Sequence, residues 1–490
     1  MNLVNEGYLG SPWTGTTGKI KERRFAGWLN SKGLTDDPRK REKLTALFLL
    51  DAYDACYREM YGFLRNELGM KQPVSDQNHH SEWLLSFLRD KYDYVDNHYY
   101  FDHPQFPVKA WRLPARLDNE SSLKHAGSDL TWMFPARIWG KPMAITEFDY
   151  AKPNFYRAEG GVLPAAYAGL QDWNGLVQFA YSHGGGNIIH DQTTGGMFDL
   201  GSDVVKMLSH RIGVKLFLGR EIKPSPVMLA AVFANPEEMD FSMVPSRDLR
   251  NLGLVARLGT AVLPDGNSIR SKLPAEISAL LDTGYNFPNA SFAVPVVKAG
   301  AFGSDPFGDL EKKNILPAGS RDVSKKIFRS AGGQLELDSA RESFRASAPG
   351  IEVLILPEKN RGSSGVMEIA NRTGRGVFSL QSVDGKPLTE SGRMLFLHLT
   401  DSQASQLKFD NPLMKQYSSW GKAPHLAARG EADVVLALPG DYTLYSCDTG
   451  GKRLAEIPLK RLANGKYGFR ADVFRPEGQV FVYELVRKLK

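Results

Sequence analysis

The sequence predicts an α/β fold in residues 1–220, followed by an all-β region from about residue 331. In the first part, short apolar runs alternate with helical patterns, which favours a parallel sheet with right-handed connections. Polar residues gather where the predicted strands end, as they do at the active-site face of a (β/α)8 barrel. In the second part, turn residues separate short strands at regular intervals, which indicates a β-sandwich.

The predicted elements of residues 1–220 follow one another closely. Apolar residues recur every three or four positions along residues 47–64, the period of one helical face, and the acidic pair before Pro38 is typical of a helix start. The predicted strands cover residues 2–5, 72–77, 93–98, 142–147 and 174–180, and the predicted helices cover residues 38–69, 81–91, 163–173 and 203–218. A long loop is expected over residues 101–139.

Residues 221–330 are rich in Pro, Gly and Asn, and their apolar runs include residues 227–233 and 292–297. We interpret this segment as a linking subdomain. Residues 331–490 are interpreted as the β-sandwich domain. Its predicted strands cover residues 351–356, 377–382, 394–399, 434–438, 442–446 and 480–485, and its turn signals are Asp384-Gly385, Pro439-Gly440 and Gly450-Gly451.

The composition is that of an ordinary soluble protein, with 490 residues, 42% hydrophobic and 24% charged. A net charge of +6 is small for this length, and no long basic run indicates nucleic-acid binding. Two cysteines, Cys56 and Cys447, are too few for a disulfide framework or a thiolate zinc site. No apolar run is long enough to span a bilayer, and the first residues lack the pattern of a signal peptide. We therefore expect neither nucleic acid nor a membrane as partner.

Two glutamates end predicted strands that lie far apart in the chain. Glu6 ends the run that starts at residue 2, and Glu147 ends the run that starts at residue 143. Hydrolysis of a glycosidic bond with retention needs two carboxyl groups about 5–5.5 Å apart, one to protonate the leaving oxygen and one to attack the anomeric carbon. An Asn-Glu pair alone says little, because Asn66-Glu67 is a second such pair at the end of an amphipathic helix.

Three motifs follow three predicted strands in a characteristic order: Asn5-Glu6, then His98-Tyr99-Tyr100, then Ile145-Thr146-Glu147-Phe148. This order resembles clan A glycoside hydrolases, most nearly the cellulase-like family 5 group, over residues 1–220. The resemblance implies a retaining β-glycosidase with Glu6 as general acid/base and Glu147 as nucleophile. It also implies that residues 1–220 are strands 4–8 of a TIM barrel and that the C-terminal β-sandwich is an accessory domain.

The same resemblance assigns the neighbouring residues. Asn5 would hydrogen-bond the sugar 2-hydroxyl, and His98 and Tyr100 would bind the sugar or orient Glu147. Further candidates for the sugar subsites are Asn78, Trp111 and Tyr181, although core packing is the alternative for a single Trp. An oligo- or polysaccharide is the expected substrate, and no metal ion or other cofactor is expected.

Barrel strands 1–3 have no counterpart in this sequence. We therefore expect either that the chain is a fragment of a longer protein or that a partner, including a second copy bound through the open barrel edge, completes it. For the full-length protein the resemblance implies a secreted or periplasmic location. The activity of this chain by itself, the sugar, the linkage and endo or exo action stay open.

Other functions fit the sequence less well. His183-Gly184-Gly185-Gly186 resembles the oxyanion loop of lipases, but the sequence has no G-x-S-x-G nucleophile motif. Residues of the types that bind metal ions also occur close together in one stretch: His79, His80, His98, Asp102 and His103. Their spacing matches no known metal-binding motif. A non-catalytic carbohydrate-binding protein, or an inactive fragment of a glycosidase, stays open as the alternative.

Overall fold

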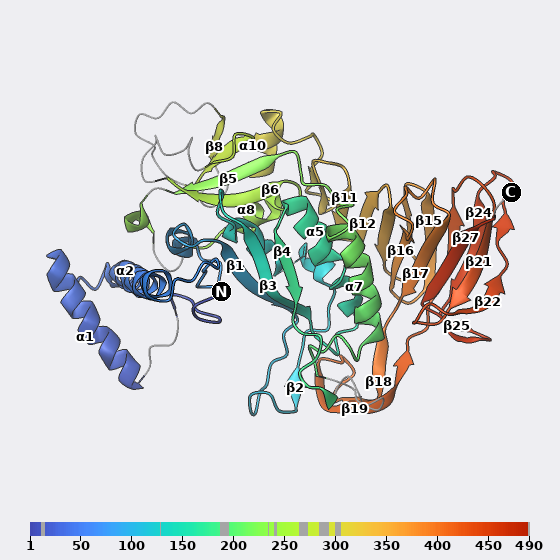
Figure 1. Ribbon diagram of the computed structural model, residues 1–490, viewed down its shortest axis with the longest axis horizontal. Helices are drawn as coiled ribbons and strands as arrows, with labels where there is room; N and C mark the ends of the chain where they lie inside the picture. Colours follow the sequence, from blue (N-terminus) through green and yellow to red (C-terminus); the bar gives the residue numbers. More distant parts are fainter. Residues whose placement is uncertain are drawn as a thin grey trace.

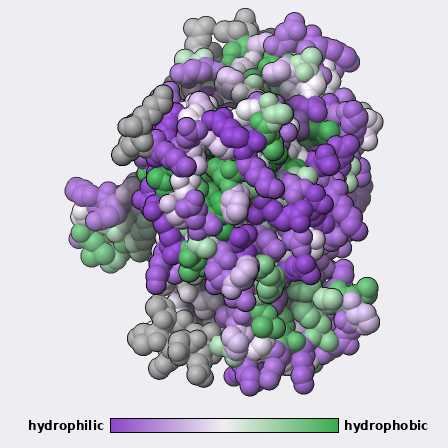
Figure 2. Space-filling model, turned by 90° about the vertical axis from the view of Figure 1, so that its right-hand side faces the viewer, coloured by the Kyte–Doolittle hydropathy of each residue, from purple (hydrophilic) through white to green (hydrophobic). Residues whose placement is uncertain are grey.

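The computed structural model describes residues 1–10, 15–127, 129–186, 196–233, 235–239, 243–263, 273–283, 294–298 and 305–488 (Figure 1). The structure is mixed α/β, with two parallel sheets before residue 300 and a large antiparallel sheet after residue 320. Of the described helices, none combines the length and the apolar character needed to cross a membrane. Figure 2 views the molecule from the side on which the antiparallel sheets lie, where hydrophilic residues predominate and hydrophobic ones form separate groups.

The first parallel sheet has the order β1-β3-β4, formed by Val95–Phe101, Met143–Tyr150 and Gly175–Gln178. These are the strands predicted at residues 93–98, 142–147 and 174–180, with ends displaced by one to three residues. The predicted helices at residues 163–173 and 203–218 are also present, as α5 (Leu163–Gln171) and α7 (Val204–Phe217). The alternation of strands and helices therefore identified this sheet correctly.

The two predicted strands at residues 2–5 and 72–77 are reduced to an isolated parallel bridge between Asn2 and Ser75. The second segment lies beside β1, because the Asp93 N–H donates to Val74 O at 3.0 Å and the His98 N–H donates to residue 78 at 2.9 Å. Beyond this bridge, Glu6 and Gln77 adopt a positive φ of 56°, which lies outside the extended region. The prediction of regular strands is thus wrong here, although the segments line up beside the sheet.

The N-terminal helices differ from the prediction in their number. A helix that the sequence pattern does not predict, α1 (Gly15–Lys32), lies against α2 (Arg41–Gly62), with the Phe25 and Phe48 rings 5.6 Å apart. The predicted helix at residues 38–69 is α2 with a π-helical extension, and the predicted helix at residues 81–91 is a 3₁₀ turn followed by α3 (Ser86–Arg89). The predicted loop contains β2 (Ala115–Arg116) and α4 (Leu130–Ala136).

The segment interpreted as a linking subdomain contains a second parallel sheet of order β6-β5-β7-β8. Its strands are β5 (Met228–Phe233), β6 (Arg257–Val262), β7 (Ala279–Asp282) and β8 (Val296–Lys298), accompanied by α8 (Arg247–Leu252) and α10 (Pro306–Lys312). The apolar run at residues 227–233 became β5. The run at residues 292–297 overlaps β8, and its residues 292–293 lie outside the described residues.

The C-terminal part is built on a ten-stranded antiparallel sheet. In sheet order its strands are β22 (Arg453–Ile457), β21 (Tyr442–Cys447), β27 (Val482–Arg487), β17 (Arg393–Leu399), β16 (Gly376–Ser382), β13 (Ile351–Leu356), β12 (Ser343–Ala348), β11 (Leu335–Asp338), β10 (Ile327–Arg329) and β9 (Arg321–Asp322). All the strands predicted after residue 350 are present. Gly385, Gly440 and Gly451 take up positive φ in the turns, as the turn signals require.

A five-stranded antiparallel sheet shares a hydrophobic core with the ten-stranded one. Its order is β14 (Arg361–Ser364), β15 (Met367–Thr373), β20 (Glu431–Leu436), β24 (Tyr467–Asp472) and β23 (Lys460–Arg461). Phe396 of the large sheet meets Phe469 of the small one, with ring centroids 5.3 Å apart. Two antiparallel sheets over one core are compatible with the predicted β-sandwich.

The large sheet also joins the two halves of the chain. Strands β9 and β10 precede the predicted boundary at residue 330, yet they belong to this sheet. On the sheet face turned to the α/β part, Phe344 packs against Tyr167 of α5, with ring centroids 6.1 Å apart. The all-β region therefore begins earlier than predicted and packs directly on the helices (Figure 1).

A long hairpin leaves the antiparallel sheets and returns to the α/β part. It consists of β18 (Ser402–Phe409) and β19 (Gln416–Ala427), and β19 pairs with β2, where Tyr417 lies opposite Ala115. Figure 1 shows β18 and β19 extending away from the sheets toward β2. The hairpin thus links residues about 300 positions apart in the sequence.

Candidate active site

The structure brings Glu6 and Glu147 together. One carboxylate oxygen of each and a ring nitrogen of His98 all lie within 4.8 Å of one another. Glu147 lies on β3 directly opposite His98 of β1, and a register shift between Asn97 and His98 precedes this pair. An oxygen separation of at most 4.8 Å fits the short spacing of a retaining pair, roughly 5–5.5 Å, better than the roughly 6.5–9.5 Å of an inverting pair.

Glu6 is held through its backbone. Its positive φ of 56° is uncommon for a glutamate, and its N–H donates to Asn78 Oδ1 at 2.7 Å. The Glu6 side chain is 43% exposed, whereas that of Glu147 is 19% exposed. The acidic group at position 6 therefore faces solvent while the one at position 147 is largely enclosed.

His98 lies between the two carboxylates. Its side chain is only 2% exposed, and Nδ1 lies 3.5 Å from Glu6 Oε1 and 3.4 Å from Glu147 Oε2. On the other side of the ring, Nε2 lies 2.9 Å from Asn78 Nδ2. Nδ1 is therefore the ring nitrogen that faces both glutamates, and Nε2 is the one that faces Asn78.

Asp96 organises the layer behind His98. This buried carboxylate accepts from Asn2 Nδ2 at 3.0 Å, from Asn78 Nδ2 at 3.2 Å and from the Thr146 hydroxyl. Thr146 Oγ1 in turn lies 3.1 Å from His98 Nε2. One carboxylate thus connects the N-terminal segment, the residue-78 segment and β3 to the same imidazole. Asp96 and Asn2 were not among the predicted site residues, because a single Asp within a strand gives no signal of such a role.

Tyr100 contacts Glu147 directly, as its hydroxyl donates to Glu147 Oε2 at 2.6 Å. Burial, together with this hydrogen bond, raises the pKa of Tyr100 far above its usual range. The phenol is therefore a permanent donor that orients one oxygen of Glu147 and stabilises its negative charge.

A cavity of about 470 Å³ lies beside the pair, and its lining includes His98 and Tyr100. Neither glutamate lines it; its other walls are His79, His80, Ser81, Glu82, Tyr99, His103, Asp129, Trp132, Met133 and Val244. Burial raises the pKa of Asp129 to about 6. Asp129 was not among the predicted site residues, because it stands alone in the stretch predicted as a loop.

The remaining predicted residues have different surroundings. Asn78 is buried and is a structural support rather than a wall of the site. Trp111 is 59% exposed, and His103 connects it to Tyr100, with ring centroids 5.7 Å apart in both contacts. Tyr181 is 53% exposed and its ring is close to Gly201. Asn5 is exposed, next to Glu6, and no hydrogen bond to its side chain is found within the described residues.

The cluster of Glu6, His98 and Glu147 also has the composition of a metal site, so we tested its fit. In tetrahedral coordination at about 2.0–2.1 Å, two ligand atoms lie roughly 3.4 Å apart. The separations of His98 Nδ1 from the two carboxylates match this value, and the carboxylate oxygens lie within 4.8 Å. A divalent ion could therefore bind between the glutamates after a small movement of one side chain.

The histidine-rich stretch does not form a metal site as a whole. His80 Nδ1 pairs with Glu82 Oε1 at 2.8 Å, and Asp102 accepts from the N–H groups of Asp118 and Asn119 at 2.6 and 2.8 Å. His79 is closer to the site, with Nδ1 3.7 Å from Glu6 Oε1. Burial lowers the pKa of His79, so this ring is neutral near pH 7.

The glycine-rich motif after β4 begins with His183, whose Nδ1 lies 2.5 Å from Asp199 Oδ1. Its ring is also 5.3 Å from that of Phe179. Gly184, Gly185 and Gly186 are exposed, and residues 187–195, which follow them, lie outside the described residues.

Comparisons with protein-family models, with curated proteins and with solved structures find no match to this chain.

Proposed function

We propose that this chain carries the active site of a retaining glycoside hydrolase that cleaves β-glycosidic bonds by double displacement. The proximity of the Glu6 and Glu147 carboxylates, within 4.8 Å, is the observation that carries this proposal. In the first step Glu147 attacks the anomeric carbon while Glu6 protonates the leaving oxygen. In the second step Glu6 removes a proton from water, which attacks the glycosyl-enzyme ester and releases Glu147.

The environments of the two glutamates support these roles. Glu147 is enclosed and accepts from Tyr100, which suits a nucleophile that must stay ionised and oriented. Glu6 is exposed toward solvent, which suits a group that exchanges protons with the leaving group and with water. His98 Nδ1 lies between the two carboxylates, 3.5 Å from Glu6 Oε1 and 3.4 Å from Glu147 Oε2.

The arrangement of the strands supports a partial TIM barrel. The residues around Asn2, the segment at residues 74–78, β1, β3 and β4 lie side by side in chain order, as strands 4–8 of such a barrel would. Glu6 follows the first of these segments, and Glu147 lies in the C-terminal half of the fourth, β3. In this proposal the substrate is an oligo- or polysaccharide, and the antiparallel sheets form the β-sandwich that accompanies the barrel.

The direct test compares Glu147→Gln and Glu6→Gln with the wild-type chain on aryl β-glycosides. We expect Glu147→Gln to abolish hydrolysis and to leave sugar binding intact. With an activated leaving group that needs no protonation, the Glu6→Gln variant should still form the glycosyl-enzyme intermediate. Added azide should then react with this intermediate, which increases the turnover rate and yields a β-glycosyl azide. The matched control is Glu67→Gln, an exposed glutamate that also follows an asparagine. Wild-type rates in Glu147→Gln would refute the assignment.

A non-catalytic carbohydrate-binding protein is the second candidate, and the exposure of Glu6 and Trp111 at one site is compatible with it. A carbohydrate-binding protein would bind sugar equally well as wild type and as Glu147→Gln. Neither protein would release the aryl group from an aryl β-glycoside. The same substrate panel therefore separates the two functions.

A further inference from the structure

Trp111 stands on a rigid aromatic support next to the candidate active site. Its ring is exposed, and its backbone is held at a φ of 61°. Ring centroids of Phe106, His103 and Phe198 lie 5.2, 5.7 and 6.4 Å from that of Trp111. His103 also lines the cavity beside Glu147. Trp111 is thus an exposed apolar ring next to His103, a residue that lines that cavity.

The C-terminal half of the chain completes this support. Trp420 of β19 packs against a buried cluster of Ala151, Met197 and Phe198, and Tyr100, Phe106 and Phe179 pack against the same cluster. Trp420 is also 5.3 Å from the ring of Tyr417, which lies opposite Ala115 of β2. The hairpin therefore packs on the aromatic cluster that surrounds Trp111.

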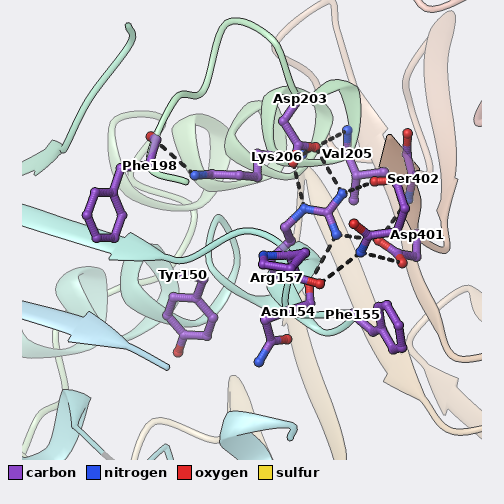
Figure 3. Close-up of polar contacts among 12 residues, drawn as sticks. Tyr150, Asn154, Phe155, Arg157, Phe198, Asp203, Val205, Lys206, Asp401 and Ser402 are labelled. Carbon is purple, nitrogen blue, oxygen red and sulfur yellow. Dashed lines mark hydrogen bonds and ion pairs between the residues drawn. The ribbon is translucent and has the colours of Figure 1, made fainter. Parts of the chain in front are cut away.

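A buried ion network fixes the base of this hairpin (Figure 3). Arg157 has no exposed side-chain surface and donates to the carboxylates of Asp203 and Asp401 and to the carbonyl oxygens of Asn154 and Ser402. Ser402 is the first residue of β18. All five N–H groups of the guanidinium are therefore used, which fixes the start of β18 on the α/β part.

The same network also holds Phe198, one of the aromatic residues around Trp111. Asp203 caps α7 by accepting from the Lys206 N–H at 3.1 Å, and Lys206 Nζ donates to Phe198 O at 3.3 Å and to Asp149 Oδ2 at 2.6 Å. Figure 3 shows this bond from Lys206 to Phe198 on the side of the helix opposite Asp401. Phe198 is thus held by Lys206 through its backbone, and it belongs to the buried cluster against which Trp420 packs.

We propose that Trp111, supported by the β18–β19 hairpin, forms a second sugar subsite beside the catalytic pair, and that Trp420 is its positioning residue. The ligand is a pyranose unit of a β-linked oligosaccharide, whose apolar C–H face stacks on the exposed indole. A ring held by packing loses little conformational entropy when the sugar binds, so the support increases affinity. The choice of ligand class rests on the proposed function.

The test is a binding titration in Glu147→Gln, which excludes hydrolysis during the measurement. The probes are the mono-, di- and trisaccharides of the β-1,4-glucan, β-1,4-mannan and β-1,4-galactan series, followed by calorimetry. In the series that binds, we expect Trp111→Ala and Trp420→Ala to reduce disaccharide and trisaccharide affinity about fivefold to tenfold, as loss of an aromatic stacking contact does. Monosaccharide affinity should be unchanged.

The control is Leu426→Ala, because Leu426 is an exposed residue on the same strand as Trp420. Trp420→Phe keeps an aromatic ring and should retain most of the oligosaccharide affinity. This variant separates loss of the aromatic support for Trp111 from misfolding. Oligosaccharide affinities in Trp420→Ala equal to those of Leu426→Ala would overturn the proposal. If wild-type protein cleaves no glycoside yet these losses occur, the glycosidase assignment fails while the subsite stands.

Discussion

Replacing Asp203 with Asn removes one charge from the buried ion network without removing a helix cap. Arg157 Nε donates to Asp203 Oδ2 at 2.6 Å and Nη2 donates to Oδ1 at 3.4 Å. Asp203 also accepts from the first N–H groups of α7, at Val205 and Lys206, at 3.1 Å each. Asn caps helices about as well as Asp, so the Asp203→Asn change isolates the charge opposite Arg157.

Loss of one partner of a buried ion pair costs about 3–5 kcal/mol, because the remaining charge is buried without compensation. Asp401 still contacts Arg157, so we expect a loss near the lower end, about 3 kcal/mol of unfolding free energy. Guanidinium unfolding followed by circular dichroism at pH 7 measures it. The control is Asp433→Asn, because Asp433 pairs with Arg372 and Arg470 at the surface and should contribute less than about 1 kcal/mol. Equal losses in the two variants would refute the reasoning.

The pH dependence of this effect has a definite sign. Burial alone would raise the pKa of Asp203, but Arg157 outweighs burial and holds the pKa well below its ordinary value of 3.8. A carboxyl with a lowered pKa in the folded state stabilises the fold above its unfolded pKa and loses this contribution as the pH falls. The difference between wild type and Asp203→Asn should therefore be constant from pH 7 to pH 5 and should shrink below about pH 4.

Two further predictions concern a metal ion and a buried histidine. If the glycosidase needs no metal, EDTA should leave its activity unchanged. Micromolar zinc should inhibit the enzyme by binding Glu6, His98 and Glu147. Loss of activity with EDTA would instead indicate a metalloenzyme. Burial lowers the pKa of His398 to about 3, and its two ring nitrogens have no hydrogen-bond partner among the described residues. Because this folded pKa is depressed, the unfolded chain takes up the proton first, and stability should fall by about 3 kcal/mol between pH 7 and pH 4.5. His398→Leu should remove that part of the pH dependence in urea unfolding curves, and an unchanged slope would contradict this.

The sequence alone was sufficient to predict that four residues of the candidate site lie near one another. Glu6, His98, Tyr100 and Glu147 each follow or end an apolar run, and parallel strands bring their C-terminal ends to one edge of a sheet. In the structure His98 lies beside both glutamates, and the Tyr100 hydroxyl donates to Glu147. Strand periodicity and turn glycines likewise predicted the antiparallel strands, because each is a local pattern.

Other features could not be predicted, because they depend on partners distant in the sequence. Asp96 is one acidic residue within a strand, and only the fold shows that it binds Asn2, Asn78 and Thr146. The hairpin strand β18 has the mostly polar sequence SQASQLKF, which lacks the alternation of a half-buried strand. It is ordered through Arg157, which lies 244 residues away from Asp401.

The ten-stranded sheet determines how this chain can be divided. Its strands come from residues 321–487, on both sides of the predicted boundary at residue 330, and its face rests on α5 and α7. A cut at residue 330 would separate β10 from β11 and leave an open edge able to pair with another molecule. Swapping the antiparallel part between proteins as an independent module would also remove Trp420 and the Asp401 contact with Arg157. The two halves should therefore be inherited, expressed and engineered as one unit.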